Sequence, residues 1–155
     1  LRATLLRAAL EGLEAGEPLS LRAAARRAGV STGAPYRHFA DRAALESLGL
    51  TPERLAERMQ GLTGRARAAL GTEVVIDNRL AVSCEEWKGL VVCPWPHGGR
   101  FDKRITMVRR MDTGQTCSWT DLHIHLIAEH GFFEGKGAAF RLEPADLARI
   151  LFDPA

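Results

Sequence analysis

Cysteine is scarce in this chain, long apolar runs are missing, and the net charge is close to zero. The three cysteines, Cys84, Cys93 and Cys117, are an odd number in 155 residues. This argues against a disulfide framework and favours reduced thiols or metal ligands. No apolar run approaches the roughly 18 residues of a membrane helix, and no apolar core of a signal peptide is recognisable near the N-terminus. We therefore expect a soluble, cytoplasmic protein without a membrane segment.

Charge is distributed unevenly along the chain, although the net value is only +2. Residues 1–50 contain seven arginines and five acidic residues, and residues 51–72 contain four arginines and two acidic residues. Residues 73–155 contain ten basic and twelve acidic residues. An apolar content of 46% suffices for a real core. We expect a basic module at residues 1–48, a connecting helix at 49–72 and a second module at 73–155.

Four short helices are predicted within residues 1–48, which we call the head. Ser20 is a suitable N-cap for a helix from Leu21 to Ala28, and Gly29 supplies the positive φ of a tight turn. Ser31 or Thr32 then caps a third helix, and Asp41 caps a fourth helix from Arg42 to Leu48. Residues 1–15 form the first helix because an apolar stripe recurs at helical spacing. The stripe comprises Leu1, Leu5, Leu6, Ala9, Leu10 and Leu13.

The head resembles the DNA-binding region of the tetracycline-repressor (TetR) family of bacterial transcriptional regulators. The resemblance lies in the first-helix stripe and in the segments LSLRAAARRAGVS and GAPYRHFADRAAL. It implies an all-α helix-turn-helix head that binds a double-stranded DNA operator sequence-specifically, as a repressor and a homodimer, and it implies no enzymatic activity. A recognition helix of this kind enters the major groove with its N-terminal residues near the base edges.

The resemblance also indicates which residues contact DNA. The small residues at the start of the third helix permit close approach, and Thr32 can donate a hydrogen bond to a base or a phosphate. Tyr36 and His38 suit phosphate oxygens, and Arg42 lies at a helix N-terminus that favours anions. Ser20 either contacts a phosphate or only caps its helix. The full set of expected DNA contacts is Ser20, Ser31, Thr32, Gly33, Ala34, Tyr36, Arg37, His38 and Arg42.

The second half departs from that family, in which a large all-helical domain for ligand binding and dimerisation follows the head. From Glu73 the hydrophobic period switches to two, which predicts four or five short antiparallel strands. A helix through His130, a short strand near residues 139–142 and a last helix from Pro144 to Phe152 follow. The expected fold class is therefore α+β, with the helical head followed by a small domain of antiparallel sheet plus helices. Such a domain could bind a small-molecule or protein effector.

Cysteine and histidine are concentrated in this second module, which suggests a zinc site because Zn²⁺ takes four tetrahedral nitrogen or sulfur ligands. The candidate ligands are Cys93 and His97 with two of His123, His125 and His130, and the favoured set is Cys93, His97, His125 and His130. The spacing is not a CxxC pair. On an ideal helix, moreover, His125 and His130 lie well apart. The alternative is a set of buried cysteines in strands, with solvent-facing or hydrogen-bonded histidines and no metal.

A second functional hypothesis assigns the activity to residues 73–155. In this interpretation they form a small metal-binding, enzymatic or protein-interaction domain, and the head serves only for packing. Cys93 beside a histidine could act as a nucleophile, but the sequence identifies no third group that would orient the pair. Exposure of the expected DNA contacts would distinguish the two hypotheses.

Overall fold

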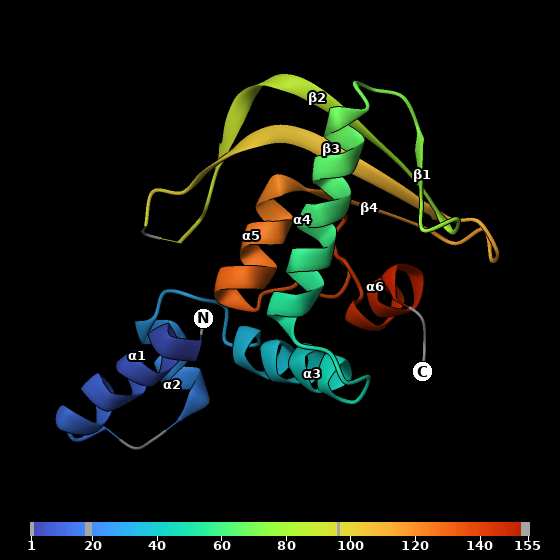
Figure 1. The fold of residues 1–155 in the computed structure, drawn as a ribbon. Helices are drawn as coiled ribbons and strands as arrows, with labels where there is room; N and C mark the ends of the chain where they lie inside the picture. Colours follow the sequence, from blue (N-terminus) through green and yellow to red (C-terminus); the bar gives the residue numbers. More distant parts are fainter. Residues whose placement is uncertain (1, 18–19, 96, 153–155) are drawn as a thin grey trace.

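A four-stranded antiparallel sheet arches over α-helices, and further helices pack outside the arch (Figure 1). The computed structural model describes residues 2–17, 20–95 and 97–152, with the backbone only for Arg2 and residues 34–39. The helices are α1 (Arg2–Glu14), α2 (Leu21–Arg27), α3 (Ala34–Glu46), α4 (Pro52–Ala68), α5 (Asp121–His130) and α6 (Pro144–Leu151). The strands are β1 (Val74–Ile76), β2 (Leu80–Val92), β3 (Arg100–Arg110) and β4 (Thr116–Thr120), paired in chain order.

The main core lies between the sheet and α4, with α5 beside α4 under the arch. Leu55, Met59, Leu62 and Ala66 recur on one face of α4 at helical spacing, and each is at most 1% exposed. They pack in one cluster with apolar residues of the sheet, of α5 and of α6. The free energy of burying this stripe therefore holds α4 to the sheet as part of a single core.

A buried polar network crosses the same core. The indole N–H of Trp119 on β4 donates to the Thr63 hydroxyl of α4 at 2.9 Å, and that hydroxyl lies 2.8 Å from the Thr106 hydroxyl on β3. All three side chains are at most 1% exposed. Because buried polar groups are costly unless they are paired, this network fixes the position of α4 on the sheet.

β2 is a single long strand, whereas the sequence predicts two short strands with a turn at Lys88 and Gly89. The register with β3 shifts between Trp87 and Leu90, where the strand has a β-bulge. Gly89 adopts φ 112° there, a conformation that glycine tolerates readily. The Lys88-Gly89 pair therefore forms a β-bulge and not a turn, and β2 continues beyond it to Val92.

The predicted fold class is wrong for the head, although the chain as a whole is α+β. Residues 34–46 form one continuous helix, so Asp41 lies inside α3 and caps no fourth helix. Its carboxylate is buried and pairs with Arg141, with 2.8 Å between Oδ1 and Nη2. Leu45 on α3 is fully buried in the main core, and α3 packs against α6. The four short helices of an independent all-α helix-turn-helix head are not formed.

The physical reason is that no helix breaker occurs between residues 36 and 46, so α3 propagates through the expected boundary. The Asp41 side chain, which can cap a helix, is drawn instead to a cation supplied by a distant part of the chain. The start of α3 also differs from the prediction. The N-cap of α3 is Gly33, not Ser31 or Thr32 as predicted, and no side chain caps the helix there.

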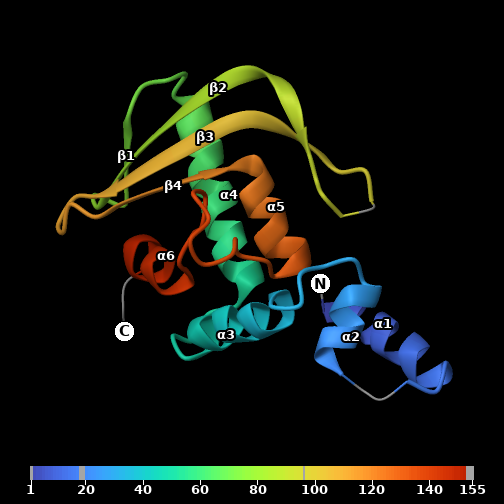
Figure 2. The same ribbon diagram turned by 180° about the vertical axis from the view of Figure 1, so that it is seen from behind.

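α1 and α2 form a small unit to one side of the other elements (Figure 2). Leu5 is buried, but Leu6, Leu10 and Leu13 are exposed, although all four belong to the stripe predicted to face inward. Leu1 lies outside the described residues. The seven-residue, alanine-rich α2 is too small to cover a wide stripe, and the third helix that would complete a bundle packs elsewhere.

Candidate metal centre

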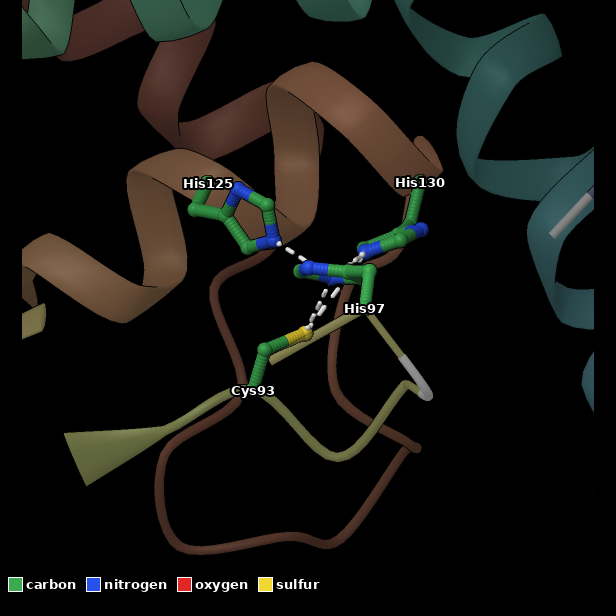
Figure 3. Close-up of side chains that lie close together, drawn as sticks. All are labelled: Cys93, His97, His125 and His130. Carbon is green, nitrogen blue, oxygen red and sulfur yellow. Dashed lines mark hydrogen bonds between the residues drawn. The ribbon is translucent and has the colours of Figure 1, made fainter. Parts of the chain in front are cut away.

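Four potential metal ligands from two distant parts of the chain converge at the end of β2 (Figure 3). Cys93 directly follows β2, His97 lies in the connection between β2 and β3, and His125 and His130 lie on α5. Their candidate ligand atoms all lie within 4.8 Å of one another. Within the described part of the chain, no other group of three or more such side chains is found.

The connection between β2 and β3 folds back on itself and turns His97 over Cys93. The amide of Cys93 donates to the carbonyl of Gly99 at 2.8 Å, and the amide of His97 donates to the carbonyl of Trp95 at 2.8 Å. A Cβ atom on Gly99 would lie only 2.7 Å from Cε1 of His97. Glycine at position 99 therefore leaves room for the imidazole of His97. The backbone nitrogen of Gly99 lies 3.2 Å from Nδ1 of that ring.

α5 supplies the other two imidazoles, and its ends are well defined. Thr120 caps its N-terminus, and Gly131 ends it with φ 55° directly after His130. His125 and His130 are five residues apart, yet their ring centroids lie 5.1 Å from each other. Positions five residues apart leave an ideal helix in different directions. Both rings instead turn towards His97, whose Nε2 lies 3.1 Å from the Nε2 atom of each (Figure 3).

Four of the six distances between the donor atoms are close to those of a tetrahedral site, and all six are within 4.8 Å. Zinc–nitrogen distances of about 2.05 Å and a zinc–sulfur distance of about 2.3 Å give tetrahedral edges of about 3.3 Å between nitrogens and about 3.6 Å between nitrogen and sulfur. In the protein, Sγ of Cys93 lies 3.0 Å from Nε2 of His97 and 3.6 Å from Nε2 of His130. Together with the two 3.1 Å distances between imidazole nitrogens, four edges of the tetrahedron lie within about 0.6 Å of the ideal lengths.

The imidazoles of α5 are held in the form that binds a metal. Burial lowers the pKa of His130 to about 4, and the neighbouring imidazoles of His125 and His97 act in the same direction. Burial also lowers the pKa of His125, with His97 as the next cause. Both rings are therefore neutral at pH 7, and a neutral imidazole has the lone pair that metal coordination requires.

Aromatic rings cover two of the four ligands. Trp95 stacks on His130 with 4.4 Å between ring centroids and 12° between planes, and Phe101 stacks on His125 at 4.4 Å and 28°. Both aromatic residues lie near Cys93 and His97 in the sequence, at every second position of Cys93-x-Trp95-x-His97-x-Gly99-x-Phe101. Sequence reasoning did not assign them to the site, and this alternation is the signal that could have identified them.

The remaining histidine and cysteine candidates lie elsewhere. His123 points away from the cluster, with Nδ1 2.8 Å from the Thr120 hydroxyl and Nε2 3.1 Å from the Phe140 carbonyl. Burial raises the pKa of Cys117 to about 12, and burial also raises the pKa of Cys84. These two thiols are therefore protonated, unreactive groups within the sheet.

The residues expected to contact DNA are only partly described. Ser20 caps α2 by accepting a hydrogen bond from the Ala23 amide at 3.5 Å. Ser31 and Thr32 are exposed just before α3, and Gly33 is its N-cap. Arg42 forms an ion pair with Glu46 at 2.9 Å on the same helix. The side chains of Ala34, Tyr36, Arg37 and His38 lie outside the described residues.

Comparison with known proteins gives no relative for this chain: no protein-family model, curated protein or solved structure matches it. Nor does any helix in the described part of the chain have the length and apolar character needed to cross a membrane.

Proposed function

We propose that this protein binds one Zn²⁺ ion through Sγ of Cys93 and the Nε2 atoms of His97, His125 and His130. The observation that carries the proposal is the convergence of four soft and borderline donors, two from a strand connection and two from a helix, with four of their distances close to tetrahedral. One thiolate and three imidazoles in a tetrahedral arrangement suit zinc better than magnesium or calcium, which prefer oxygen ligands.

The site supports a structural role for the metal. Four protein ligands fill a tetrahedral zinc site and leave no open position for a substrate, unlike catalytic sites with three protein ligands. The ligands follow a Cys-x3-His…His-x4-His order, in which one pair comes from a strand connection and the other from a helix. That order is similar in layout to zinc fingers, which also pair ligands from a hairpin and a helix. The metal would clamp the β2–β3 connection to the C-terminal end of α5.

Metal analysis of protein purified without chelators tests the proposal. We expect about one zinc per chain, and we expect Co²⁺ substitution to give the visible absorption of a tetrahedral cobalt–thiolate centre. Cys93→Ser and His125→Ala should each weaken zinc affinity more than about 100-fold, because loss of a ligand exceeds the effect of losing its outer-shell partner. His123→Ala is the matched control, since this histidine lies on the same helix and points away.

Substoichiometric zinc in the wild-type protein would contradict the proposal. Equal loss of zinc in His123→Ala and His125→Ala would contradict it as well, because the effect would then come from general disruption of α5.

A second candidate is double-stranded DNA binding by the N-terminal part of the chain. It is supported by the exposure of Ser20, Ser31 and Thr32 around α2 and the start of α3, and by the excess of arginine in residues 1–72. A homodimer would then occupy the two half-sites of an operator, and an effector would act through residues 73–155. Selection from random DNA tests this candidate: enrichment of a palindrome with salt-sensitive affinity supports it, and recovery of unenriched sequence refutes it.

A further inference from the structure

The α1–α2 pair is attached to the rest of the protein through a small apolar contact next to the metal ligands. Leu5 of α1 and Ala25 of α2 are 5% and 0% exposed, and they form a core cluster separate from the main one. Trp95 and Phe132 pack against this cluster from the other side. Trp95 lies between Cys93 and His97 in the sequence, and Phe132 lies two residues after His130.

Trp95 contacts both the metal ligands and the apolar cluster of α1 and α2. One face of its indole stacks on His130 at 4.4 Å, and Phe132 meets the indole edge-on at 5.1 Å. The same side chain that covers a metal ligand therefore forms part of the wall on which α1 and α2 pack. Figures 1 and 2 both show this pair near the end of α5 that carries His130, outside the arch of the sheet.

We propose that occupancy of the metal site controls the docking of the α1–α2 pair, with Trp95 as the link. This inference rests on the proposed zinc site. Coordination of Cys93, His97 and His130 fixes the β2–β3 connection against α5 and so holds the Trp95 ring in place. Without a cation, these side chains are held together only by hydrogen bonds of 3.0 to 3.6 Å among the thiol and the imidazoles. Such bonds are weaker than coordination of all four groups to one ion, so the connection opens more easily.

Opening of the connection removes the docking wall, and the α1–α2 pair cannot compensate by itself. Its helices have 13 and 7 residues, and isolated helices shorter than about 12 to 15 residues are marginal in water. Few of its own apolar side chains are buried, since Leu6, Leu10 and Leu13 remain exposed even when the pair is docked. α4 and the sheet, in contrast, share a large core that does not include the metal ligands' connection. Metal loss should therefore loosen α1 and α2 selectively.

Hydrogen–deuterium exchange of the full chain, with saturating zinc or with a chelator, tests the inference. We expect removal of zinc to accelerate amide exchange in residues 3–27 about tenfold or more through local opening, while α4, β2 and β3 still exchange more slowly than these residues, because they open only when the whole protein unfolds. Trp95→Ala removes no ligand, so it can be compared at a zinc concentration that metal analysis shows to saturate the variant. Under that condition zinc should no longer slow exchange in residues 3–27. Trp87→Ala is the matched control: Trp87 lies on β2, is 49% exposed, and its replacement should leave the zinc effect intact.

The outcomes separate the two proposals. If the protein binds no zinc, the zinc site itself is wrong. If zinc binds stoichiometrically and exchange in residues 3–27 is unchanged by chelation, the zinc site stands and the docking inference is overturned. If Trp95→Ala keeps the full zinc-dependent protection of these residues, Trp95 is not the link.

Discussion

Removal of zinc should lower the thermal stability of the protein by a margin that follows from the positions of the ligands. The metal joins Cys93 and His97 to His125 and His130 and so closes a loop of about 30 residues. A cross-link over a loop of that length restricts the unfolded chain and lowers its entropy. For a disulfide this effect stabilises the folded state by about 3.5 kcal/mol, and we use the same figure for the metal. Binding linkage gives a similar figure, because a ligand at about 1,000 times its Kd stabilises the folded state by about 4 kcal/mol.

For a chain of this length, 1 kcal/mol corresponds to about 2 to 4 °C in Tm. We therefore expect chelation to lower Tm by about 7 to 16 °C, measured by calorimetry at fixed protein concentration and pH. The shift produced by zinc should disappear in Cys93→Ser and persist in Cys117→Ser, a control that also replaces a cysteine thiol outside the cluster. Each variant is compared with itself, with and without zinc. The change in Tm caused by the substitution alone therefore cancels. A full zinc-dependent shift in Cys93→Ser, or none in the wild-type protein, would refute the reasoning.

Three further predictions concern the rest of the fold. Thr63→Val keeps the shape of the side chain but leaves the buried Trp119 indole N–H without its acceptor, and should cost about 2 to 4 kcal/mol in urea denaturation; a loss below about 0.5 kcal/mol would contradict it. Asp41→Asn removes one of the two carboxylates that pair with Arg141 and leaves Glu143 in place, so it should cost about 1 to 3 kcal/mol; an unchanged midpoint would show that α3 is held in another way. The Cys117 thiol, with its pKa raised from 9.0 to about 12 by burial, should carry about a thousandfold less thiolate than an ordinary cysteine at pH 8, and alkylation kinetics should show correspondingly slow modification.

The four candidate ligands could be named from the sequence because cysteine and histidine are rare enough in this chain for their concentration in one module to be informative. Their geometry could not be judged from the helix alone. His125 and His130 converge because a loop from another part of the chain places His97 between them. Trp95 likewise reaches His130 only because the β2–β3 connection folds against α5.

In the head, in contrast, the local sequence pattern predicts two short helices where tertiary contacts hold one continuous helix, α3. Asp41 has the chemistry of a helix cap, and its position before an apolar run fits that role. Its actual partner, Arg141, lies 100 residues further along the chain. Local propensity cannot reveal such a pairing, and a strong family pattern in a short segment gives no information about what packs against it.

The Asp41–Arg141 pair also determines when the protein can finish folding during its synthesis. α3 leaves the ribosome early, but its buried carboxylate and Leu45 acquire their C-terminal partners only after residues 141–151 have emerged. At about 5 to 20 residues per second, the intervening hundred residues take about 5 to 20 s to translate. During that interval the apolar face of α3 is incompletely covered, so a nascent chain stalled before residue 141 should be a good substrate for chaperones that bind apolar segments.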